Sequence, residues 1–234
     1  DKKLRVGVHL CNQFELIVRH VAGQLDRLPE VIAQIRRHGF ANYFGAQRFG
    51  RQGDNVQQAL RALSNRHKRK RLGRAKKSLY VSALRSELFN QILSQRIRQG
   101  IWQRPLNGDA FMLDGSQSLF NADIDADILR RYQQQDIHSA ISLYGRGEGR
   151  ISAQAGEIED QIIEAYPQIA QLLEALDIQR GYRAHRALAG DLQFSVERDK
   201  GLLKLSVVLA KGSYMTSLLN HIIDIDEQHE RLEG

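Results

Sequence analysis

The first stretch of the chain alternates apolar and polar residues. Residues 4–10 carry Leu4, Val6, Val8 and Leu10 between polar or small neighbours, and residues 14–18 repeat the alternation. The polar triplet Cys11-Asn12-Gln13 between them indicates a turn. Residues 3–20 are therefore predicted to form a β-hairpin.

The next segment changes to helical spacing. Asp26 is placed to cap a helix, Pro29 suits its first turn, and Gly39 is placed to end it. The apolar stripe of this helix is made of Leu28, Val31, Ile32 and Ile35. A β-hairpin followed by a helix indicates an α+β layer.

The middle of the chain reads mostly as helices. The apolar spacing predicts helices over residues 55–63, 78–97 and 125–135, and over 152–176 with an interruption at Pro167. A short apolar run at 110–113 and a glycine-rich turn at 145–149 lie between them. The last part returns to β structure, with strands at 192–196 and 203–209 joined by the turn Arg198-Asp199-Lys200-Gly201, and then a helix over 216–225.

This order is α+β, then mostly helical, then α+β. We therefore expect one sheet-based domain that carries an inserted domain, with residues 1–67 and 189–234 as its two portions and residues 68–188 as the insertion. The first boundary is placed at the basic run of residues 66–77, because a block of like charges is typical of a junction.

The charge balance is basic, with 34 Lys and Arg against 27 Asp and Glu, a net charge of +7 and a pI of about 9.7. A basic surface attracts polyanions, of which nucleic acid is the commonest, although a merely basic globular protein has the same balance. No stretch approaches the roughly 20 apolar residues of a membrane span, so we expect no membrane partner. Cys11 is the only cysteine, which excludes an internal disulfide and suits a cytoplasmic protein. The histidines and the cysteine form no cluster with ligand spacing, so no metal site is expected.

The chain starts with Asp1 rather than Met, and its first residues already alternate as a strand. We therefore expect that it begins inside a fold, with an N-terminal segment of the same protein removed or lying in another chain.

Residues 40–54 are rich in glycine and aromatic residues, which indicates a loop whose backbone turns tightly or approaches a ligand closely. Within it, Gly-Phe-Ala-Asn-Tyr-Phe-Gly-Ala-Gln-Arg-Phe-Gly at 39–50 resembles a signature of the TruD family of tRNA pseudouridine synthases. Residues 77–90 resemble the start of that family's inserted TRUD domain, and residues 212–219 resemble its C-terminal Gly-Ser-aromatic-x-Thr motif. The three segments follow in the family's order, and the resemblance covers essentially the whole chain, more weakly over 101–190.

The resemblance implies an α+β fold: the pseudouridine synthase mixed sheet with flanking helices, interrupted by a mostly helical TRUD insertion domain. It implies the isomerisation of uridine 13 of tRNA to pseudouridine, without a metal or organic cofactor. It also implies a nucleophilic aspartate in a Gly-x-Lys-Asp-x-x-Ala-x-Thr motif. That motif does not occur in the 234 residues, and Asp1, Asp26 and Asp54 lie outside any such context. The chain is therefore expected to lack the nucleophile and to be inactive alone.

The resemblance also implies site residues. Asn42 would contact the flipped uridine, Phe44 would wall the pocket and Tyr214 would stack on the base. Gln47 and Arg48 would pair with a phosphate or orient the catalytic carboxylate. The residues alone leave structural roles open: a turn closed by Asn42, aromatic side chains in the core, and a loop pinned by Arg48.

The basic run is the predicted contact with the RNA backbone. Its candidate residues are Lys68, Arg69, Lys70, Arg71, Lys76 and Lys77, and the later cations Arg180, Arg183 and Arg186 are weaker candidates. A solvated charge run is the structural alternative. The first functional hypothesis is a tRNA pseudouridine synthase component with tRNA as its partner. The alternatives are a non-catalytic RNA-binding module and a basic structural protein that binds no RNA.

Overall fold

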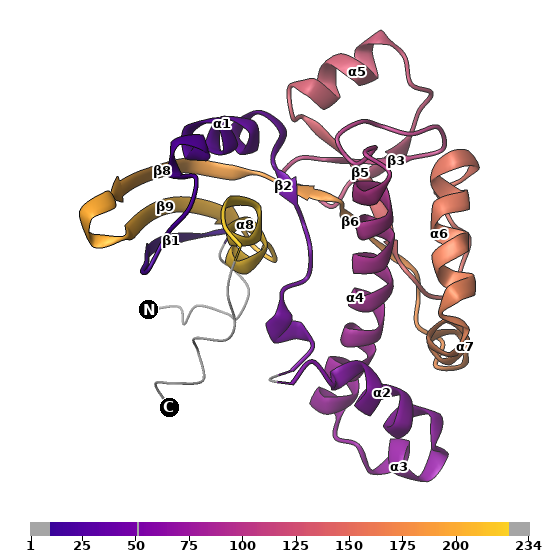
Figure 1. Cartoon of the computed structure of the whole chain (residues 1–234). Helices are drawn as coiled ribbons and strands as arrows, with labels where there is room; N and C mark the ends of the chain where they lie inside the picture. The colour runs from indigo at the N-terminus through magenta and orange to yellow at the C-terminus, as the bar shows by residue number, and fades with distance from the viewer. Residues whose placement is uncertain (1–9, 51, 225–234) are drawn as a thin grey trace, which may run out of the picture. The chain divides into compact units, whose positions relative to one another are not determined.

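The structure is a computed structural model, and it describes residues 10–50 and 52–224. The chain forms two compact units (Figure 1). The first contains the described residues of Asp1–Asn42 and Ala187–Gly234, and the second is Tyr43–Arg186. The middle of the sequence is thus an insertion between two distant parts of one unit, and residues 43–67 group with this insertion.

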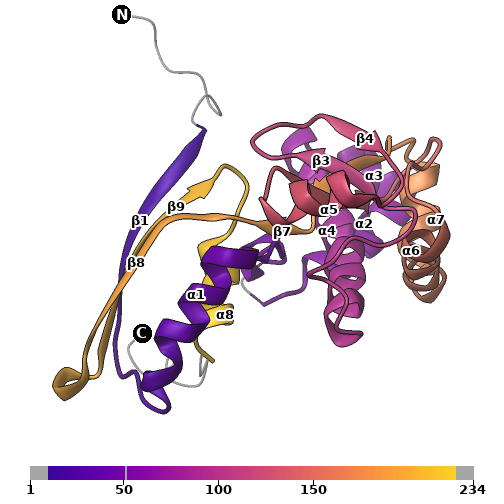
Figure 2. The same ribbon diagram turned by 90° about the horizontal axis from the view of Figure 1, so that it is seen from above.

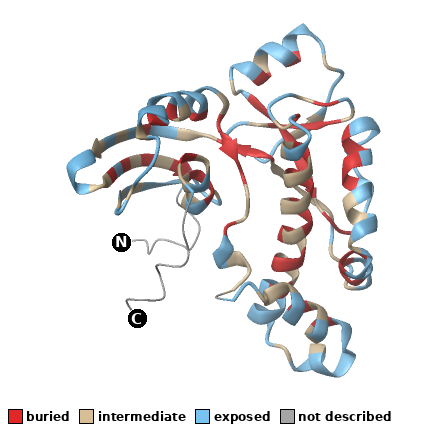
Figure 3. Ribbon diagram, viewed as in Figure 1, coloured by how far each residue is buried: buried red, intermediate tan, exposed pale blue. Residues whose placement is uncertain are grey.

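The first unit is built on a three-stranded antiparallel sheet in the order β1-β9-β8. The strands are β1 (Cys11–Val18), β8 (Ala189–Glu197) and β9 (Leu202–Ala210). Along β9, Leu203, Leu205, Val207 and Leu209 are buried. In Figure 3 the buried positions alternate along this strand, as expected of a sheet with one covered face.

Two helices cover that face: α1 (Leu28–His38) and α8 (Met215–Ile222) (Figure 2). Their buried residues join those of β9 in one apolar core: Leu28, Ile32 and Ile35 from α1, and Leu218 and Ile222 from α8. The short helix η1 (Leu25–Arg27) precedes α1. The predicted helix over this segment, the β8–β9 hairpin and the C-terminal helix are therefore confirmed.

The end of α1 shows why glycine stands at position 39. Gly39 has φ of 72°, and a Cβ there would lie 2.6 Å from the carbonyl oxygen of Ala187. Only glycine adopts this backbone conformation without strain and leaves room for the neighbouring strand. The predicted cap at the other end is wrong: Asp26 lies within η1, and the N-cap position belongs to Arg27.

The predicted turn at Cys11-Asn12-Gln13 is also wrong. These residues are the first part of β1, and they pair with Ala210, Leu209 and Val208 of β9. Cross-strand pairing decides the conformation of an exposed edge strand more strongly than its polar side chains do. The strand predicted over 4–10 lies outside the described residues except for Leu10, which is not part of a strand.

A second, two-stranded sheet lies where the chain passes from the first unit to the second and back. It joins β2 (Phe40–Ala41) to β7 (Arg186–Ala187). Phe40 and Ala41 are fully buried. Short strands with buried side chains of this kind fix where the following loop starts.

The second unit is organised around the 25-residue helix α4 (Arg74–Arg98). Helices α2 (Asn55–Ser64), α6 (Ala153–Ala165) and α7 (Pro167–Ala175) pack on it. Figure 3 shows buried positions running along α4. The predicted helices of this region are confirmed, including the break before Pro167. The basic run, expected at a junction, is helical: it forms α3 (Arg66–Arg71) and the first turn of α4.

The second unit also contains a four-stranded antiparallel sheet in the order β4-β3-β5-β6, which the mostly helical prediction left out. The strands are β3 (Ala110–Leu113), β4 (Leu119–Asn121), β5 (Ile137–Leu143) and β6 (Gly181–Ala184). Helix α5 (Ala126–Gln133) follows β4, and Asp125 caps it by accepting from the Ile128 amide at 2.8 Å. The sequence did not predict β5. The strand is buried on both faces and contains the polar residues His138, Ser139 and Ser142, so its apolar and polar residues do not alternate.

A buried ion pair joins α4 to this sheet. The guanidinium of Arg96 donates to the carboxylate of Asp109 at 2.7 Å, and both side chains are 0% exposed. The Oδ2 atom of Asp109 also accepts from the Ser139 hydroxyl at 2.6 Å and from the Leu106 amide at 2.8 Å. These bonds satisfy the carboxylate, which is the condition for burying such a charge.

His185 gives the second unit an expected dependence on pH. It is fully buried and lies at 3.0 Å from the Tyr132 hydroxyl. Burial lowers the pKa of His185 well below its usual value, and the charges of Arg96, Arg186 and His138 act in the same direction. A proton therefore binds the unfolded chain, with a pKa of about 6.5, more readily than the folded unit.

We expect the contribution of His185 to the free energy of unfolding of this unit to be fully present above about pH 6.5 and to fall as the pH drops below it; His138, whose pKa burial also lowers, acts in the same direction. The slope due to His185 approaches about 1.4 kcal/mol per pH unit, and His185→Gln should remove it. Denaturant unfolding followed by the fluorescence of Trp102, the only tryptophan, measures this unit. The control is His221→Gln in the first unit, which should leave the slope unchanged; a slope in His185→Gln as steep as that of the unsubstituted protein contradicts the assignment.

Candidate nucleic-acid interface

The glycine-rich loop after Asn42 is held on α4 by side chains of that helix. The side-chain oxygen of Asn90 accepts from the Phe44 amide at 2.9 Å, and its nitrogen donates to the Phe44 carbonyl at 3.0 Å. The Tyr43 hydroxyl lies 3.0 Å from the hydroxyl of Ser94, one helical turn further on. Residues four apart share a helix face, so one side of α4 fixes the loop backbone.

A third residue on α4 fixes the far end of the loop. The guanidinium of Arg48, in the short helix η2 (Ala46–Arg48), donates to the Ser82 hydroxyl at 2.9 Å. The side chain of Asn55 donates to the Arg48 carbonyl at 3.2 Å. This is the loop-pinning role that the sequence left open for Arg48, and a role toward RNA stays a prediction. Gln47, in the same turn, is exposed.

The ring of Phe44 is half-buried among aromatic and cationic groups. Its centroid lies 5.3 Å from that of Phe89 at an interplanar angle of 80°, an edge-to-face contact. The guanidinium carbons of Arg183 and Arg48 lie 4.2 Å and 5.5 Å from the same centroid. The ring is thus in contact with both α4 and β6, and its predicted place in a pocket wall is not tested by these contacts.

The other two predicted pocket residues belong to the first unit. Asn42, 7% exposed, directly follows β2. The amide of Ala41, its neighbour, lies 3.3 Å from Nε2 of His221, while Nδ1 of that imidazole lies 3.3 Å from the Ser217 carbonyl. Only a neutral ring protonated on Nδ1 makes both bonds, because Nε2 must accept.

Burial lowers the pKa of His221, which agrees with the neutral ring, although the bond to Ser217 opposes this shift. Tyr214 is half-buried and occupies the N-cap position of α8, the helix that carries His221. The amide of Ser217 donates to the Tyr214 carbonyl at 3.0 Å. Helix α8 packs on β2 within the first unit. The first unit therefore contains both Asn42 and Tyr214. Phe44, Gln47 and Arg48 belong to the second unit.

Sequence reasoning did not single out the residues that hold these groups in place. They are Ser82, Asn90 and Ser94 on α4, Arg183 on β6, and His221 on α8. The only available signal was the polar spacing on α4, where Ser82, Asn90 and Ser94 interrupt the face of a helix at multiples of four. That spacing has meaning only once the loop is known to lie against it.

The predicted RNA-backbone residues lie at the start of the second unit's helices. All six candidates fall in α3 or the first turn of α4, and all are exposed except Arg69, which is half-buried. Asn65 caps α3 by accepting from the Lys68 amide at 3.0 Å. Two helical elements thus present the cations to solvent, as phosphate binding requires.

The later arginines divide by their environment. Arg180 lies over Tyr144, with its guanidinium carbon 5.0 Å from the ring centroid. Arg186 is 3% exposed, and its guanidinium donates to Nδ1 of His138 at 2.7 Å and to the carbonyls of Tyr132 and Ile137. The suggestion of an RNA contact at Arg186 is therefore wrong, because its guanidinium is buried and donates its hydrogen bonds to groups inside the protein.

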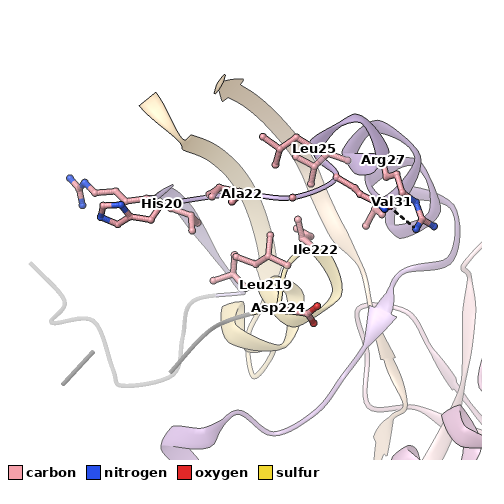
Figure 4. A pocket seen from close by; sticks show the side chains of 15 residues that line it. His20, Ala22, Leu25, Arg27, Val31, Leu219, Ile222 and Asp224 are labelled. Atoms are coloured by element: carbon pink, nitrogen blue, oxygen red, sulfur yellow. Dashed lines mark hydrogen bonds between the residues drawn. The ribbon is translucent and has the colours of Figure 1, made fainter. Parts of the chain in front are cut away.

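A cavity of about 800 Å³ lies in the first unit, between the end of β1, the start of α1 and the end of α8 (Figure 4). Val18, Leu28, Val31, Leu219 and Ile222 supply much of its apolar lining. None of the predicted site residues lines it, so it plays no part in the function considered below. Among the described residues, no group of three or more His, Cys, Asp or Glu side chains is arranged to hold a metal ion, and none of the described helices is long and apolar enough to cross a membrane.

Comparison with known proteins identifies this architecture. The structure matches that of a Methanosarcina mazei protein named as a TruD, with a TM-score of 0.73 over 96% of this chain and 71% of that one, at 17% sequence identity. A likeness at this identity shows the fold alone: this chain has the mixed α+β fold of that protein.

The sequence identifies the family. The sequence model of tRNA pseudouridine synthase D (TruD) matches residues 1–66 and 51–222. The chain is 39% identical over 229 residues to the tRNA pseudouridine synthase D of Methylococcus capsulatus and 35% identical over 224 residues to that of Hydrogenovibrio crunogenus. These matches cover 97% and 96% of the chain and 64% of each relative. The chain belongs to the TruD family, and it spans about 64% of the length of these curated relatives.

The paired hydrogen bonds of Asn90 give a test of what holds the loop. Asn90→Ala removes both hydrogen bonds to the backbone of Phe44, and we expect it to lower the free energy of unfolding of the second unit by about 1–3 kcal/mol. Denaturant unfolding followed by Trp102 fluorescence measures the loss. The control is Gln91→Ala, which removes only a bond to Glu87 within the helix and should cost less than about 0.5 kcal/mol. Equal losses in the two variants would show that the bonds to Phe44 add nothing.

Proposed function

We propose that these 234 residues form the uridine-binding and RNA-binding part of a tRNA pseudouridine synthase that isomerises uridine 13 of tRNA. In that reaction the glycosidic bond breaks, the base turns, and C5 of the uracil is joined to the ribose. Membership of the TruD family supports the reaction class. The observation that carries the proposal is the signature at residues 39–50, whose backbone is fixed on both sides of Tyr43 by side-chain hydrogen bonds, at Ala41 and at Phe44.

The pocket roles follow from the chemistry of the side chains. A uridine inside folded RNA must leave its stack before it reacts, so the protein must offer a stacking surface and polar groups for the edge of the base. The amide of Asn42 both donates and accepts, as the uracil edge requires. Tyr214 supplies a stacking ring, and Phe44 supplies an apolar wall. Gln47 and Arg48 lie in the turn that follows, beside the proposed wall.

The nucleophile is proposed to come from outside the 234 residues. The family's aspartate motif does not occur in the sequence. The second candidate, a non-catalytic RNA-binding module, rests on the same observation. It requires tRNA binding without any conversion, in every form of the protein.

A pseudouridine assay on tRNA separates these possibilities. Residues 1–234 and the complete gene product that contains them are each incubated with tRNA carrying uridine at position 13 and with a matched tRNA carrying cytidine there. We expect conversion at position 13 by the complete product and none by residues 1–234 alone. Binding without conversion by the complete product would support the non-catalytic module, and conversion at another position would overturn the choice of uridine 13.

The exposed basic helices give a prediction on affinity. We expect the combined change of Lys68, Lys70 and Lys77 to Gln to weaken tRNA binding and to reduce the slope of log K against log salt by about 0.7–0.9 for each lysine that contacts a phosphate. Fluorescence anisotropy of labelled tRNA over a salt series measures this slope. The control changes Arg198, Lys200 and Lys204 of the β8–β9 hairpin to Gln, which removes the same number of positive charges. In the structure these three residues already form ion pairs, Arg198 with Asp26 and the two lysines with Glu197. An unchanged slope in the first variant would exclude these lysines as phosphate contacts.

Tyr214 gives a prediction on the pocket. Tyr214→Ala removes a stacking surface worth about 1–3 kcal/mol per base, so the rate of pseudouridine formation should fall by about 5-fold to 160-fold. Tyr214→Phe keeps the ring and should retain most of the rate. Thermal unfolding of the same variants is the control, because Tyr214 is only half-buried. If Tyr214→Ala lowers stability and activity in parallel, Tyr214 is a core residue instead.

A further inference from the structure

Arg183 stands beside the signature loop without belonging to it. It lies on β6, where it pairs with Ile141 of β5, so its backbone is fixed by the sheet of the second unit. Its guanidinium carbon lies 4.2 Å from the ring centroid of Phe44 and 5.6 Å from that of Phe89. A separation of 4.2 Å is a close stack of a planar cation on an aromatic ring.

The contact removes the remaining freedom of the Phe44 side chain. The bonds from Asn90 fix the Phe44 backbone but leave rotation about the side-chain bonds. Phe89, which is fully buried on α4, meets the ring edge to face, and Arg183 covers a face of the ring from the sheet. The ring is therefore held between a helix and a strand, in contact with Phe89 and Arg183, and the guanidinium of Arg48 lies over it at 5.5 Å.

We propose that Arg183 is a positioning residue of the uridine site, which acts by stacking on Phe44 and holding that ring in the orientation that walls the pocket. A nucleotide that packs against Phe44 then meets the part of the ring that Arg183, Arg48 and Phe89 leave uncovered. The inference rests on the proposed function, because it assigns Arg183 to the same site. It excludes direct contact with RNA as the main role of this arginine.

The first test is a double-mutant cycle on the rate of pseudouridine formation by the complete gene product. Arg183→Gln should lower kcat by about twofold to thirtyfold, the range of a stacked cation on an aromatic ring, and leave KM for tRNA little changed. In the Phe44→Leu background the same substitution should change kcat by less than about twofold, because the ring through which it acts is gone. Arg183→Lys keeps the charge but not the planar stack, so it should behave like Arg183→Gln.

Arg180→Gln is the matched control for charge. Arg180 lies immediately before β6 and stacks on Tyr144 rather than on Phe44, so its substitution removes the same charge from the same part of the chain. Its effect, whatever its size, should add to that of Phe44→Leu. Trp102 fluorescence confirms that each variant is folded, and if Arg183→Gln does not fold, the Arg183→Lys cycle gives the same comparison.

The opposite pattern would overturn the proposal. If Arg183 contacts a phosphate, Arg183→Gln raises KM, lowers the salt slope of binding by about 0.7–0.9, keeps its full effect in the Phe44→Leu background, and is rescued by Arg183→Lys. A separate readout does not depend on activity. 4-Fluorophenylalanine at position 44, followed by ¹⁹F NMR, should have an altered chemical shift in Arg183→Gln and an unchanged chemical shift in Arg180→Gln. No conversion by the unsubstituted protein would refute the proposed function, whereas an unaltered resonance in Arg183→Gln would refute the positioning role.

Discussion

The buried ion pair between Arg96 and Asp109 is the constraint on which the second unit depends. A charge pair that is 0% exposed must satisfy its remaining polar atoms inside the protein, and Asp109 does so through Ser139 of β5 and the Leu106 amide. This requirement ties the last turn of α4 to the middle of the sheet. Together with the buried apolar side chains of α4, such as Leu84, Leu88 and Ile92, it holds the face that carries Ser82, Asn90 and Ser94 toward the signature loop. A charge pair that the loop does not touch thus contributes to the position of the loop.

In the candidate site, side chains make the hydrogen bonds to backbone amides and carbonyls that neighbouring strands or helical turns make elsewhere in the protein. Loops that lie close to a ligand carry backbone groups that no neighbouring strand or helix satisfies. Here the amide of Asn90 satisfies both groups of Phe44, and the ring of His221 accepts from Ala41. An amide serves for this because it donates and accepts at once, and a neutral imidazole does so across its two nitrogens. A helix residue can thus hold the backbone of a loop through its side chain, and the side chains of Tyr43 and Arg48 add bonds to the same helix.

The parts of the fold that the sequence predicted are those fixed by local chemistry. Helix α1 has its stripe, Pro29 and Gly39, and the β8–β9 hairpin has a glycine at position 201 with φ of 58°. The failures were at β5, whose burial on both faces removes alternation, and at Cys11–Gln13, whose strand is imposed by β9. In the candidate site, the loop residues came from a family resemblance, while Asn90 and His221 act across 46 and 180 residues of sequence. Hydrogen bonds between residues this far apart in sequence depend on the whole fold, so no local sequence pattern predicts them.

The signature segment is anchored in both units, and the boundary between the units runs through it, between Asn42 and Tyr43. On one side, His221 holds Ala41; on the other, Asn90 holds Phe44. The two anchors differ in kind. The bond from Ala41 needs a neutral imidazole, and a proton on Nε2 would place two donors against each other, whereas the amide of Asn90 does not titrate. Acid therefore acts on the Asn42 side of the signature through His221 and leaves the Phe44 side held. The two halves of one motif are thus held by groups that respond differently to pH.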